Sequence, residues 1–438
     1  MKRVIIMGAA GRDYHNFLTF FKSDKNYKVV AFTQSQIPGI EERNFPKSLA
    51  GRSYSGAIPF YPEEKLPHLI KKYNVDEVFL SYSDLSHEEV MQKASLVLSM
   101  GASFTLLGPK ETMLHSKKPV IAVCGVRTGV GKSSLSLKIM EILKKKNYDA
   151  VAIRHPMPYG NLKKNLVQRF ASVKDFKKYN STIEEQEEYH NYVKRGFVIY
   201  AGVDYKAILE AVEKKADVIL WDGGNNDFPF YHPDLLFVVT DPFRAGQEIE
   251  SYPGEANFLM ANILVINKVN TAPETKIKEI EKNIKKYKPH TKVLKVQSLV
   301  ALETNEELRG KNALVIGDGP TLTHGGMSFG AGTIAAKKYG IKIIDAKKYA
   351  EGSLKQTFKK FSHIDRELPA LGYSKKQIEE LRSTINKSKC DVVLNASPSP
   401  LKDLLKVNKP VINVTYSIDD KSARVVEQIL TKFLKSKK

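Results

Sequence analysis

Short apolar runs alternate with segments of helical periodicity along almost the whole chain. Apolar runs bounded by turn residues are typical of buried strands, and amphipathic segments between them are typical of crossover helices. The pattern therefore predicts α/β layers built on parallel sheets. The predicted strands are 4–7, 28–33, 77–82, 103–107, 120–124, 149–153, 218–222, 235–240, 263–267, 293–296, 313–316, 341–345, 392–395 and 411–414.

The most specific motif follows the run 120–124 and reads Gly125-Val-Arg-Thr-Gly-Val-Gly-Lys-Ser133, ahead of an amphipathic helix over 134–145. A buried strand, a glycine-rich turn and a helix that opens with Lys and a hydroxyl form a cradle for phosphates. The long loop resembles those of dethiobiotin-synthetase and MinD-type P-loop proteins. The residues assigned to the nucleotide are Gly125, Thr128, Gly129, Val130, Gly131, Lys132, Ser133 and Ser134.

At 438 residues the chain is too long for one ordinary core. We predict a Rossmann-like domain over 1–117, a central P-loop NTPase domain over 118–298 and a C-terminal α/β domain over 299–438. The polar, Glu-rich segment 157–196 is interpreted as an insertion over the nucleotide site. The turn 8–11 is a truncated dinucleotide fingerprint, so it either binds a cofactor or only joins strand to helix.

Metal and phosphate chemistry is expected at the ends of the central strands. Asp222 ends the strand 218–222, where P-loop domains place the acid that reaches the Mg²⁺ shell directly or through water. Ser133 is the second predicted Mg²⁺ ligand, and Lys132 would reach the β- and γ-phosphates. Arg127 either bridges these phosphates or points outward. Asp227 either joins the site or caps a turn.

Two basic segments are candidates for acceptor binding. Arg154 and His155 follow the strand 149–153 on the same edge as the phosphate loop, where they would bind a substrate phosphate or offset transition-state charge. Asp241 and Arg244 follow another strand, and either serve the site or pair with each other. We assign catalytic roles to Lys132, Arg127, Asp222, Arg154 and His155.

The stretch 317–327 is dense in glycine, which favours a backbone nest for an anion. A predicted helix begins close behind it, so a helix N-terminus would lie beside the loop. The bland alternative is an irregular connector. The predicted substrate contacts in this stretch are Thr321, Thr323, His324, Gly325 and Gly326.

A base-reading motif is incomplete in this chain. Asn267 and Lys268 would hold the base and the phosphate loop, at a position where GTPases carry Asn-Lys-x-Asp. The last residue is Asn270, which offers one acceptor oxygen and a donor, whereas the aspartate of GTPases accepts two hydrogens from guanine. ATP is therefore at least as good a fit as GTP.

The chain is strongly basic, because 69 Lys and Arg against 48 Asp and Glu give a formal charge of +21. Such a charge attracts polyanions, or belongs to a lysine-rich solvated surface. We find no zinc-ligand spacing and no basic–aromatic RNA signature, so we expect a small polyanionic substrate and no nucleic acid. No apolar run suits a membrane helix, and we expect a cytoplasmic protein, with a homodimer as an open alternative.

Taken together with the phosphate loop, the segments 32–40, 82–87, 153–160, 221–230 and 318–326 resemble the archaeal cyclic 2,3-diphosphoglycerate synthetase-like group, also described as predicted GTPases. The resemblance implies an ATP-dependent synthetase, with GTP as an alternative, which uses Mg²⁺ to close 2,3-diphosphoglycerate into an internal phosphoanhydride or activates a related phosphorylated acid.

The chain departs from this group where Asn413 and Thr415 stand in place of arginines, which favours a different acceptor. Two alternatives remain beside the synthetase. One is a P-loop switch that hydrolyses nucleotide to control a macromolecular partner. The other is a basic ATPase that binds nucleic acid.

Overall fold

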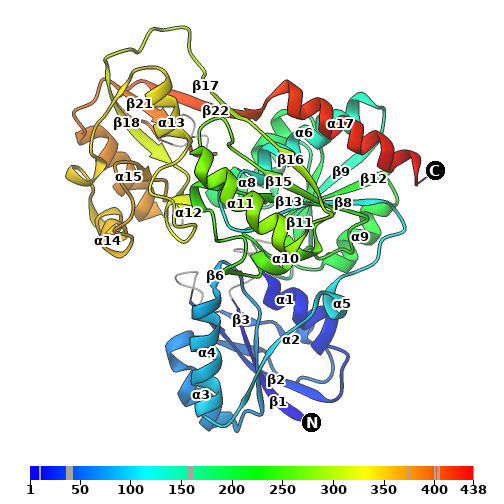
Figure 1. Cartoon of the computed structure of the whole chain (residues 1–438). Helices are drawn as coiled ribbons and strands as arrows, with labels where there is room; N and C mark the ends of the chain where they lie inside the picture. The colour runs from blue at the N-terminus through cyan, green and yellow to red at the C-terminus, as the bar shows by residue number, and fades with distance from the viewer. Residues whose placement is uncertain are drawn as a thin grey trace.

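The computed structural model describes residues 1–8, 11–35, 43–155, 161–371, 375–398, 401 and 405–437, without the side chains of residues 183 and 184. Three sheets follow one another along the chain (Figure 1), and they confirm the predicted α/β class with parallel sheets. Each of the predicted strands overlaps an observed one. Residues 36–40 and 156–160, which carry part of the family resemblance, lie outside the described residues.

The N-terminal sheet has the order β3-β4-β2-β1-β5-β7 and is parallel except for the β3–β4 pair. Its strands are β1 (Lys2–Met7), β2 (Tyr27–Gln34), β3 (Asn44–Phe45), β4 (Ile58–Pro62), β5 (Glu77–Leu80) and β7 (Ser103–Leu106). Its helices are α1 (Arg12–Asn16), a π-helix (Phe17–Phe21), α2 (Lys47–Ala50), a 3₁₀ turn (Glu63–Lys65), α3 (Leu66–Tyr73), α4 (His87–Ser99) and α5 (Pro109–Thr112).

The central sheet has the order β10-β11-β9-β12-β8-β13-β15-β16 and is parallel except for the β10–β11 pair. Its strands are β8 (Val120–Gly125), β9 (Ala150–Arg154), β10 (Val167–Phe170), β11 (Ile199–Gly202), β12 (Val218–Asp222), β13 (Leu235–Thr240), β15 (Ile263–Ile266) and β16 (Lys292–Lys295). Its helices are α6 (Lys132–Lys145), α7 (Val173–Lys178), α8 (Ile183–Lys194), α9 (Tyr205–Glu213), a 3₁₀ turn (Pro242–Arg244), α10 (Gly254–Met260) and α11 (Glu274–Tyr287).

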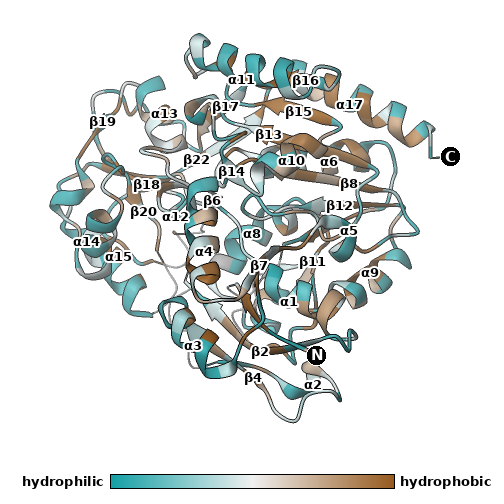
Figure 2. Cartoon of the chain, turned by 60° about the horizontal axis from the view of Figure 1, so that its bottom comes forward, coloured by the Kyte–Doolittle hydropathy of each residue, from teal (hydrophilic) through white to brown (hydrophobic). Residues whose placement is uncertain are grey.

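Burial explains why the central strands read as continuous apolar runs. Every residue of β8, β12 and β13 is buried, because helices cover both faces of a parallel sheet. Figure 2 shows these strands as hydrophobic segments inside a shell of more polar helices. The carboxyl ends of the parallel strands meet at one edge, and this edge is where the phosphate loop begins.

The C-terminal sheet has the order β17-β22-β21-β18-β19, with β20 paired to β18, and β17–β22 is its antiparallel pair. Its strands are β17 (Ser298–Leu302), β18 (Asn312–Gly317), β19 (Lys342–Ile343), β20 (Leu368–Pro369), β21 (Val392–Asn395) and β22 (Val411–Ile418). Its helices are α12 (Gly319–Leu322), α13 (Ala331–Lys338), a 3₁₀ turn (Ala346–Lys348), α14 (Gly352–Lys360), α15 (Lys375–Lys387) and α17 (Asp420–Lys435).

Two contacts tie the three regions together. Helix α17 returns to the central region beside α6 (Figure 1), where Val426 and Leu430 are fully buried in the central core. Helix α17 therefore packs on the central region rather than on the C-terminal sheet that precedes it in the chain. Near the N-terminal region, β6 (Leu85–Ser86) pairs antiparallel with β14 (Ser251–Tyr252). Among the described residues, no helix is long and apolar enough to cross a membrane.

Candidate functional site

The phosphate loop leaves β8 and turns directly into α6. Gly129 and Gly131 adopt φ angles of 78° and 99°, which L side chains rarely tolerate. A β-carbon at Gly131 would lie 2.1 Å from Nδ2 of Asn267, and one at Gly129 would lie 2.6 Å from the side chain of Thr321. The glycines are therefore required both by the turn and by the close approach of two other segments.

Lys132 opens α6 with its side chain almost fully buried. Its ammonium group donates to the backbone carbonyl of Asn225, in the loop after β12. Burial lowers the pKa of Lys132, and the nearby charge of Arg154 lowers it further. This ammonium group is therefore placed to exchange its hydrogen bond with the carbonyl of Asn225 for one with a phosphate oxygen.

Asp222 lies beneath the loop and does not line the cavity. Its Oδ1 accepts from Ser136 Oγ at 2.8 Å, and its Oδ2 accepts from Tyr192 OH at 2.8 Å. The same Oδ2 lies 2.9 Å from Arg154 NH1. Both oxygens are thus engaged, so of the two predicted arrangements at the Mg²⁺ shell, contact through water fits better than direct ligation.

The hydroxyl of Ser133, in contrast, lines the cavity, and no hydrogen bond occupies it among the described residues. It therefore fits the expected Mg²⁺ ligand at the mouth of a phosphate loop. In the described part of the chain, no group of three or more His, Cys, Asp or Glu side chains is placed to hold a metal. The bound phosphates themselves would have to supply most of the oxygen ligands.

Arg154 ends β9 and His155 follows it, and both line the cavity, as the sequence predicts. Arg154 forms ion pairs with Asp222 and with Glu188 of α8. His155 Nε2 lies 2.9 Å from Asp227 Oδ2, which leaves Nδ1 without a partner among the described residues. Burial lowers the pKa of His155, so the ring is neutral at neutral pH.

Arg12 of the N-terminal region holds the other side of Asp227. Its Nε lies 3.0 Å from Asp227 Oδ1, and its NH2 donates to the carbonyl of Phe228 at 2.6 Å. Burial alone would raise the pKa of Asp227, but Arg12 and His155 outweigh it and keep the pKa below its usual range. Asp227 therefore stays ionised. It lines the cavity and also accepts from the backbone N–H of Phe228 at 2.8 Å, so the structure shows features of both predicted alternatives.

Asp84, in the loop after β5, reaches the phosphate loop from the N-terminal region. Its side chain is fully buried and accepts hydrogen bonds from the backbone N–H of Thr128 at 3.1 Å and from the hydroxyl of Thr128. Arg127 Nε and His324 Nε2 lie 3.7 Å and 3.8 Å away. Asp84 has a φ of 65°, a strained conformation that such packing sustains.

Arg127 points toward the C-terminal region rather than into the cavity, where its NH2 donates to the carbonyl of His324 at 3.0 Å. Asp241 and Arg244 pair with each other at 3.1 Å, and Asp241 also holds Lys268 at 2.7 Å. Arg244 donates to the carbonyl of Thr128 at 2.8 Å. Arg127, Asp241 and Arg244 thus contact the loop and its neighbours from outside the cavity, whereas Lys268 lines it.

The base-reading motif is placed against the loop as predicted. Asn267 Nδ2 donates to the carbonyl of Val130 at 2.8 Å, and Lys268 Nζ donates to that of Gly129 at 3.1 Å. Asn270, however, exchanges two hydrogen bonds with the backbone of Ser298, at 3.0 Å and 2.9 Å. Its amide is consumed by this contact and does not line the cavity.

The glycine-rich stretch of the C-terminal region contributes Thr321 and His324 to the cavity. Thr323, Gly325 and Gly326 do not line it, so the structure gives only part of the predicted nest. Thr323 Oγ1 instead donates to the carbonyl of Gly319 at 2.8 Å.

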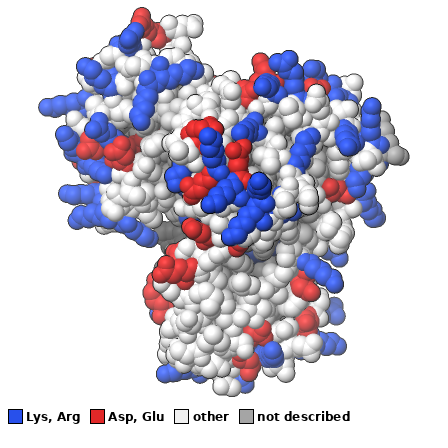
Figure 3. All heavy atoms as spheres, viewed as in Figure 1, with Lys and Arg blue, Asp and Glu red and all other residues white. Residues whose placement is uncertain are grey.

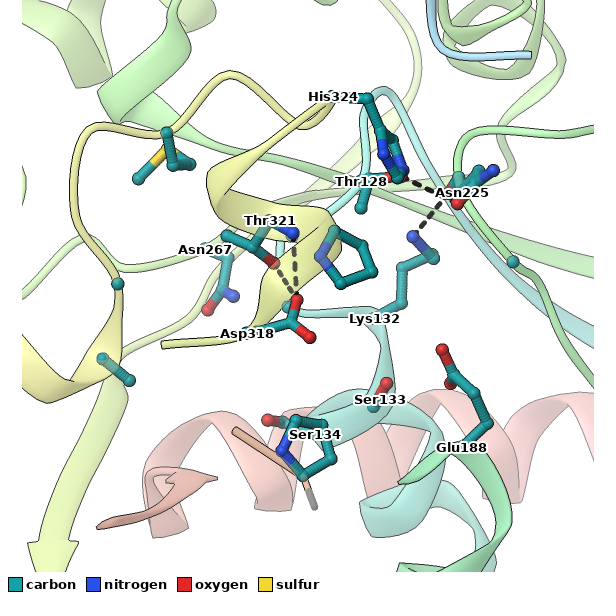
Figure 4. A pocket seen from close by; sticks show the side chains of 18 of the residues that line it. Thr128, Lys132, Ser133, Ser134, Glu188, Asn225, Asn267, Asp318, Thr321 and His324 are labelled. Carbon is teal, nitrogen blue, oxygen red and sulfur yellow. Dashed lines mark hydrogen bonds between the residues drawn. The ribbon is translucent and has the colours of Figure 1, made fainter. Parts of the chain in front are cut away.

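Together these segments enclose a cavity of about 300 Å³, to which all three regions contribute. Figure 4 shows Lys132, Ser133 and Glu188 facing the same space as Asp318. An apolar part, with Phe243, Phe329 and Ile334, lies on the side of the base-reading motif and α13. The lining residues that the sequence analysis did not assign to the site include Arg12, Glu188, Asn225, Asp318 and Tyr416.

The charge of the cavity differs from that of the whole chain. Among the described residues, four cations (Arg12, Lys132, Arg154, Lys268) and three carboxylates (Glu188, Asp227, Asp318) line it. On the face shown in Figure 3, lysines and arginines are spread over the surface and mixed with acids. On this face the basic residues lie on the solvated surface and do not gather at one site.

Comparison with known proteins identifies one close relative. A search against models of protein families finds no match. The chain is 51% identical over 436 residues to the arginine synthetase ArcE of Thermococcus kodakarensis, covering 99% of this chain and 97% of that protein.

Solved structures resemble the chain only remotely. LpxK of Aquifex aeolicus, in complex with ATP, has 13% identity and a TM-score of 0.43, covering 84% of this chain and 99% of that one. The hydrogenase maturation factor HypB of Archaeoglobus fulgidus has 17% identity and a TM-score of 0.27, covering 41% of this chain and 81% of that one.

Proposed function

The chain belongs to the family of the arginine synthetase ArcE of Thermococcus kodakarensis, and from this we propose that it is an ATP-dependent synthetase whose product is arginine. The observation that carries the proposal is 51% identity over nearly the full length of both chains. The phosphate loop supports the nucleotide, because its glycines, Lys132 and Ser133 form a cradle for a triphosphate.

The chemistry of arginine suggests the acceptor. Citrulline is the amino acid in which a ureido oxygen stands where arginine has a guanidinium nitrogen. That oxygen attacks the γ-phosphorus, the bond to the β-phosphate oxygen breaks, and ADP leaves. Ammonia then attacks the ureido carbon, the carbon–oxygen bond breaks and inorganic phosphate leaves. Phosphorylation converts a poor leaving group into a good one, which explains the need for ATP.

The residues of the site divide this work. Lys132 would hold the β- and γ-phosphates, and Arg154 at the end of β9 would offset charge on the transferred phosphoryl group. Mg²⁺ bound beside Ser133 would neutralise further phosphate charge. The Nδ1 atom of His155 would accept a proton from the attacking nitrogen, with Asp227 holding the ring and Arg12 holding Asp227.

ATP is favoured over GTP by the state of Asn270. A guanine reader needs a free carboxylate, whereas Asn270 is an amide bound on both sides to Ser298. An adenine needs no such acceptor.

Ring closure of 2,3-diphosphoglycerate is the rival reaction, from the resemblance to the cyclic 2,3-diphosphoglycerate synthetase-like group. That acceptor brings about four to five negative charges beside the triphosphate. A cavity lined by four cations and three carboxylates offers little to offset them, whereas a zwitterionic amino acid needs no such excess. The charges of the cavity therefore support the amino acid as acceptor.

The test supplies purified protein with ATP, Mg²⁺ and ammonium, and adds either citrulline or 2,3-diphosphoglycerate. Phosphorus NMR follows ADP, inorganic phosphate and any cyclic phosphoanhydride, and chromatography measures arginine. We expect arginine and ADP to form in equal amounts in the mixture with citrulline, and not in the mixture with 2,3-diphosphoglycerate. A cyclic phosphoanhydride would favour the rival. Slow hydrolysis that neither acceptor stimulates would favour a nucleotide switch that acts on a macromolecule.

A further inference from the structure

Two carboxylates of the cavity have no role in the proposed nucleotide site. Glu188 comes from α8 of the central region, and Asp318 comes from the loop between β18 and α12 of the C-terminal region. Figure 4 shows both side chains directed into the cavity, on either side of Lys132. They approach from different sheets, so only the folded chain brings them together.

Each carboxylate has one oxygen engaged and one oxygen to spare. Glu188 uses Oε2 for its ion pair with Arg154, and Asp318 uses Oδ2 to accept from the backbone and hydroxyl of Thr321. Among the described residues, nothing bonds to Glu188 Oε1 or to Asp318 Oδ1. Both free oxygens therefore remain as hydrogen-bond acceptors on the wall of the cavity.

The negative charge of Asp318 acts on Glu188, although Lys132 lies between the two side chains. Burial raises the pKa of Glu188, and the negative charges of Asp222 and Asp318 raise it further, against the opposing charges of Arg154 and Lys132. A cation with several N–H donors would relieve this repulsion and satisfy both free oxygens.

We propose that Glu188 and Asp318 form a clamp that binds a nitrogen cation of the reaction, an ammonium group with its N–H donors shared between the two carboxylates. This inference rests on the proposed function, which requires nitrogenous substrates. Two sources have the same chemistry: the α-ammonium group of the amino acid and the free ammonium ion that donates nitrogen. A diphosphoglycerate acceptor would have no use for such a clamp.

The experiment uses Glu188→Gln, Asp318→Asn and the double variant, which keep shape and remove charge. Glu187→Gln is the matched control, because this acid lies on the same helix and does not line the cavity. Steady-state rates of ADP release are measured against ATP, ammonium, citrulline and 5-ureidopentanoic acid, which lacks the α-amino group. A hydrogen bond to a charged group contributes about 1.5–3 kcal/mol, so we expect the relevant KM to rise roughly 10- to 100-fold.

The pattern of KM values distinguishes the sources. If the clamp binds the α-ammonium group, the KM of citrulline rises while that of 5-ureidopentanoic acid is unaffected. If it binds the nitrogen donor, the KM of ammonium rises instead. Unchanged KM values for both nitrogen substrates, or a rise for ATP alone, would overturn the clamp.

Failure of the clamp is separable from failure of the proposed function. A wild-type protein that makes arginine while the variants keep every KM refutes only the clamp. If the wild type makes no arginine, the proposed function fails, and calorimetry with L-arginine decides the clamp without turnover. Binding by the wild type that weakens in the double variant supports it, and equal or absent binding refutes it.

Discussion

The charged side chains are paired differently at the two ends of the cavity. At the phosphate end the cations are already paired: Arg12, Arg154 and Lys268 each form an ion pair with a carboxylate. At the acceptor end, Glu188 and Asp318 each keep a free oxygen. Under the proposed function, the first end would position the phosphates and the second would attract a nitrogen cation. The difference fits the proposed reaction, in which a nitrogen displaces phosphate from a phosphorylated acceptor.

The largest effect is expected from breaking the phosphate end. Lys132→Ala removes the ammonium group that would bind the β- and γ-phosphates, and we expect kcat to fall by roughly 1,000-fold or more. Lys138→Ala is the matched control, since this lysine also lies on α6 but pairs with the surface acid Glu141 and does not line the cavity. Steady-state turnover measures both. Near wild-type turnover by Lys132→Ala would refute the assignment of the loop.

A smaller loss is expected at the junction between the two ends. Removing the proton acceptor with His155→Ala should lower kcat by about 100- to 10,000-fold, with little change in nucleotide affinity. Because burial lowers the pKa of His155, the acid limb of the wild-type kcat profile should lie below pH 6.5.

Arg12 sharpens the same prediction, because its charge also lowers the pKa of His155. In Arg12→Gln the acid limb should move toward higher pH. A profile that does not shift would show that His155 is not the group that titrates. Circular dichroism controls for misfolding, because Asp227 loses a buried partner in this variant.

A buried histidine of the N-terminal region offers a test of how the stability of the fold depends on pH. His15 is buried, stacked on Phe230 at 3.9 Å, and burial lowers its pKa to about 3. The unfolded chain binds this proton near pH 6.5 and the folded chain does not. Stability is therefore intact above pH 6.5 and falls by about 1.4 kcal/mol per unit as the pH drops toward 3.

Denaturant titrations at a series of pH values measure this slope. His15→Phe should flatten it, because the variant has no proton to bind at this position. An identical slope in the variant would exclude His15 as the source.

The smallest effect is expected at Asn270, in the incomplete base-reading motif. Asn270→Asp restores the acid of the GTPase motif, yet the new carboxylate would face the carbonyl of Ser298 rather than a base. We expect the preference for ATP over GTP to be unchanged and stability to fall by about 1 kcal/mol. Competition between the two nucleotides measures the preference. A switch to GTP would place the base at Asn270 after all.

The phosphate loop, the central strands and the edge they share were predictable from the sequence, because their signals are local. An apolar run, a glycine at positive φ and a lysine that opens a helix all lie within a short segment. Strands β3, β4, β6, β10, β11, β14, β17 and β20 were not predicted. The shortest of them, such as β6 and β14, are defined by pairing with other segments and carry no apolar run of their own. The ends of β12 match the prediction, because an apolar run stops there at Asp222.

The site residues that the sequence analysis missed were missed for a different reason. Arg12, Glu188 and Asp318 reach the cavity from three separate regions. No local pattern marks Arg12 or Glu188, and Asp318 lies in the glycine-rich stretch 317–327, where the prediction assigned other residues to the site. Asp84 offered one weak signal, an acid among polar residues directly after a strand. The sequence also placed Thr323, Gly325 and Gly326 in the cavity, because glycine density does not tell which residues face inward.

The most direct test follows the ureido oxygen. Citrulline labelled with ¹⁸O at the ureido position is supplied with ATP, Mg²⁺ and ammonium, and mass spectrometry reads the label in inorganic phosphate and in arginine. We expect one labelled oxygen in each phosphate released with arginine. Phosphate that carries no label would contradict phosphorylation of the acceptor.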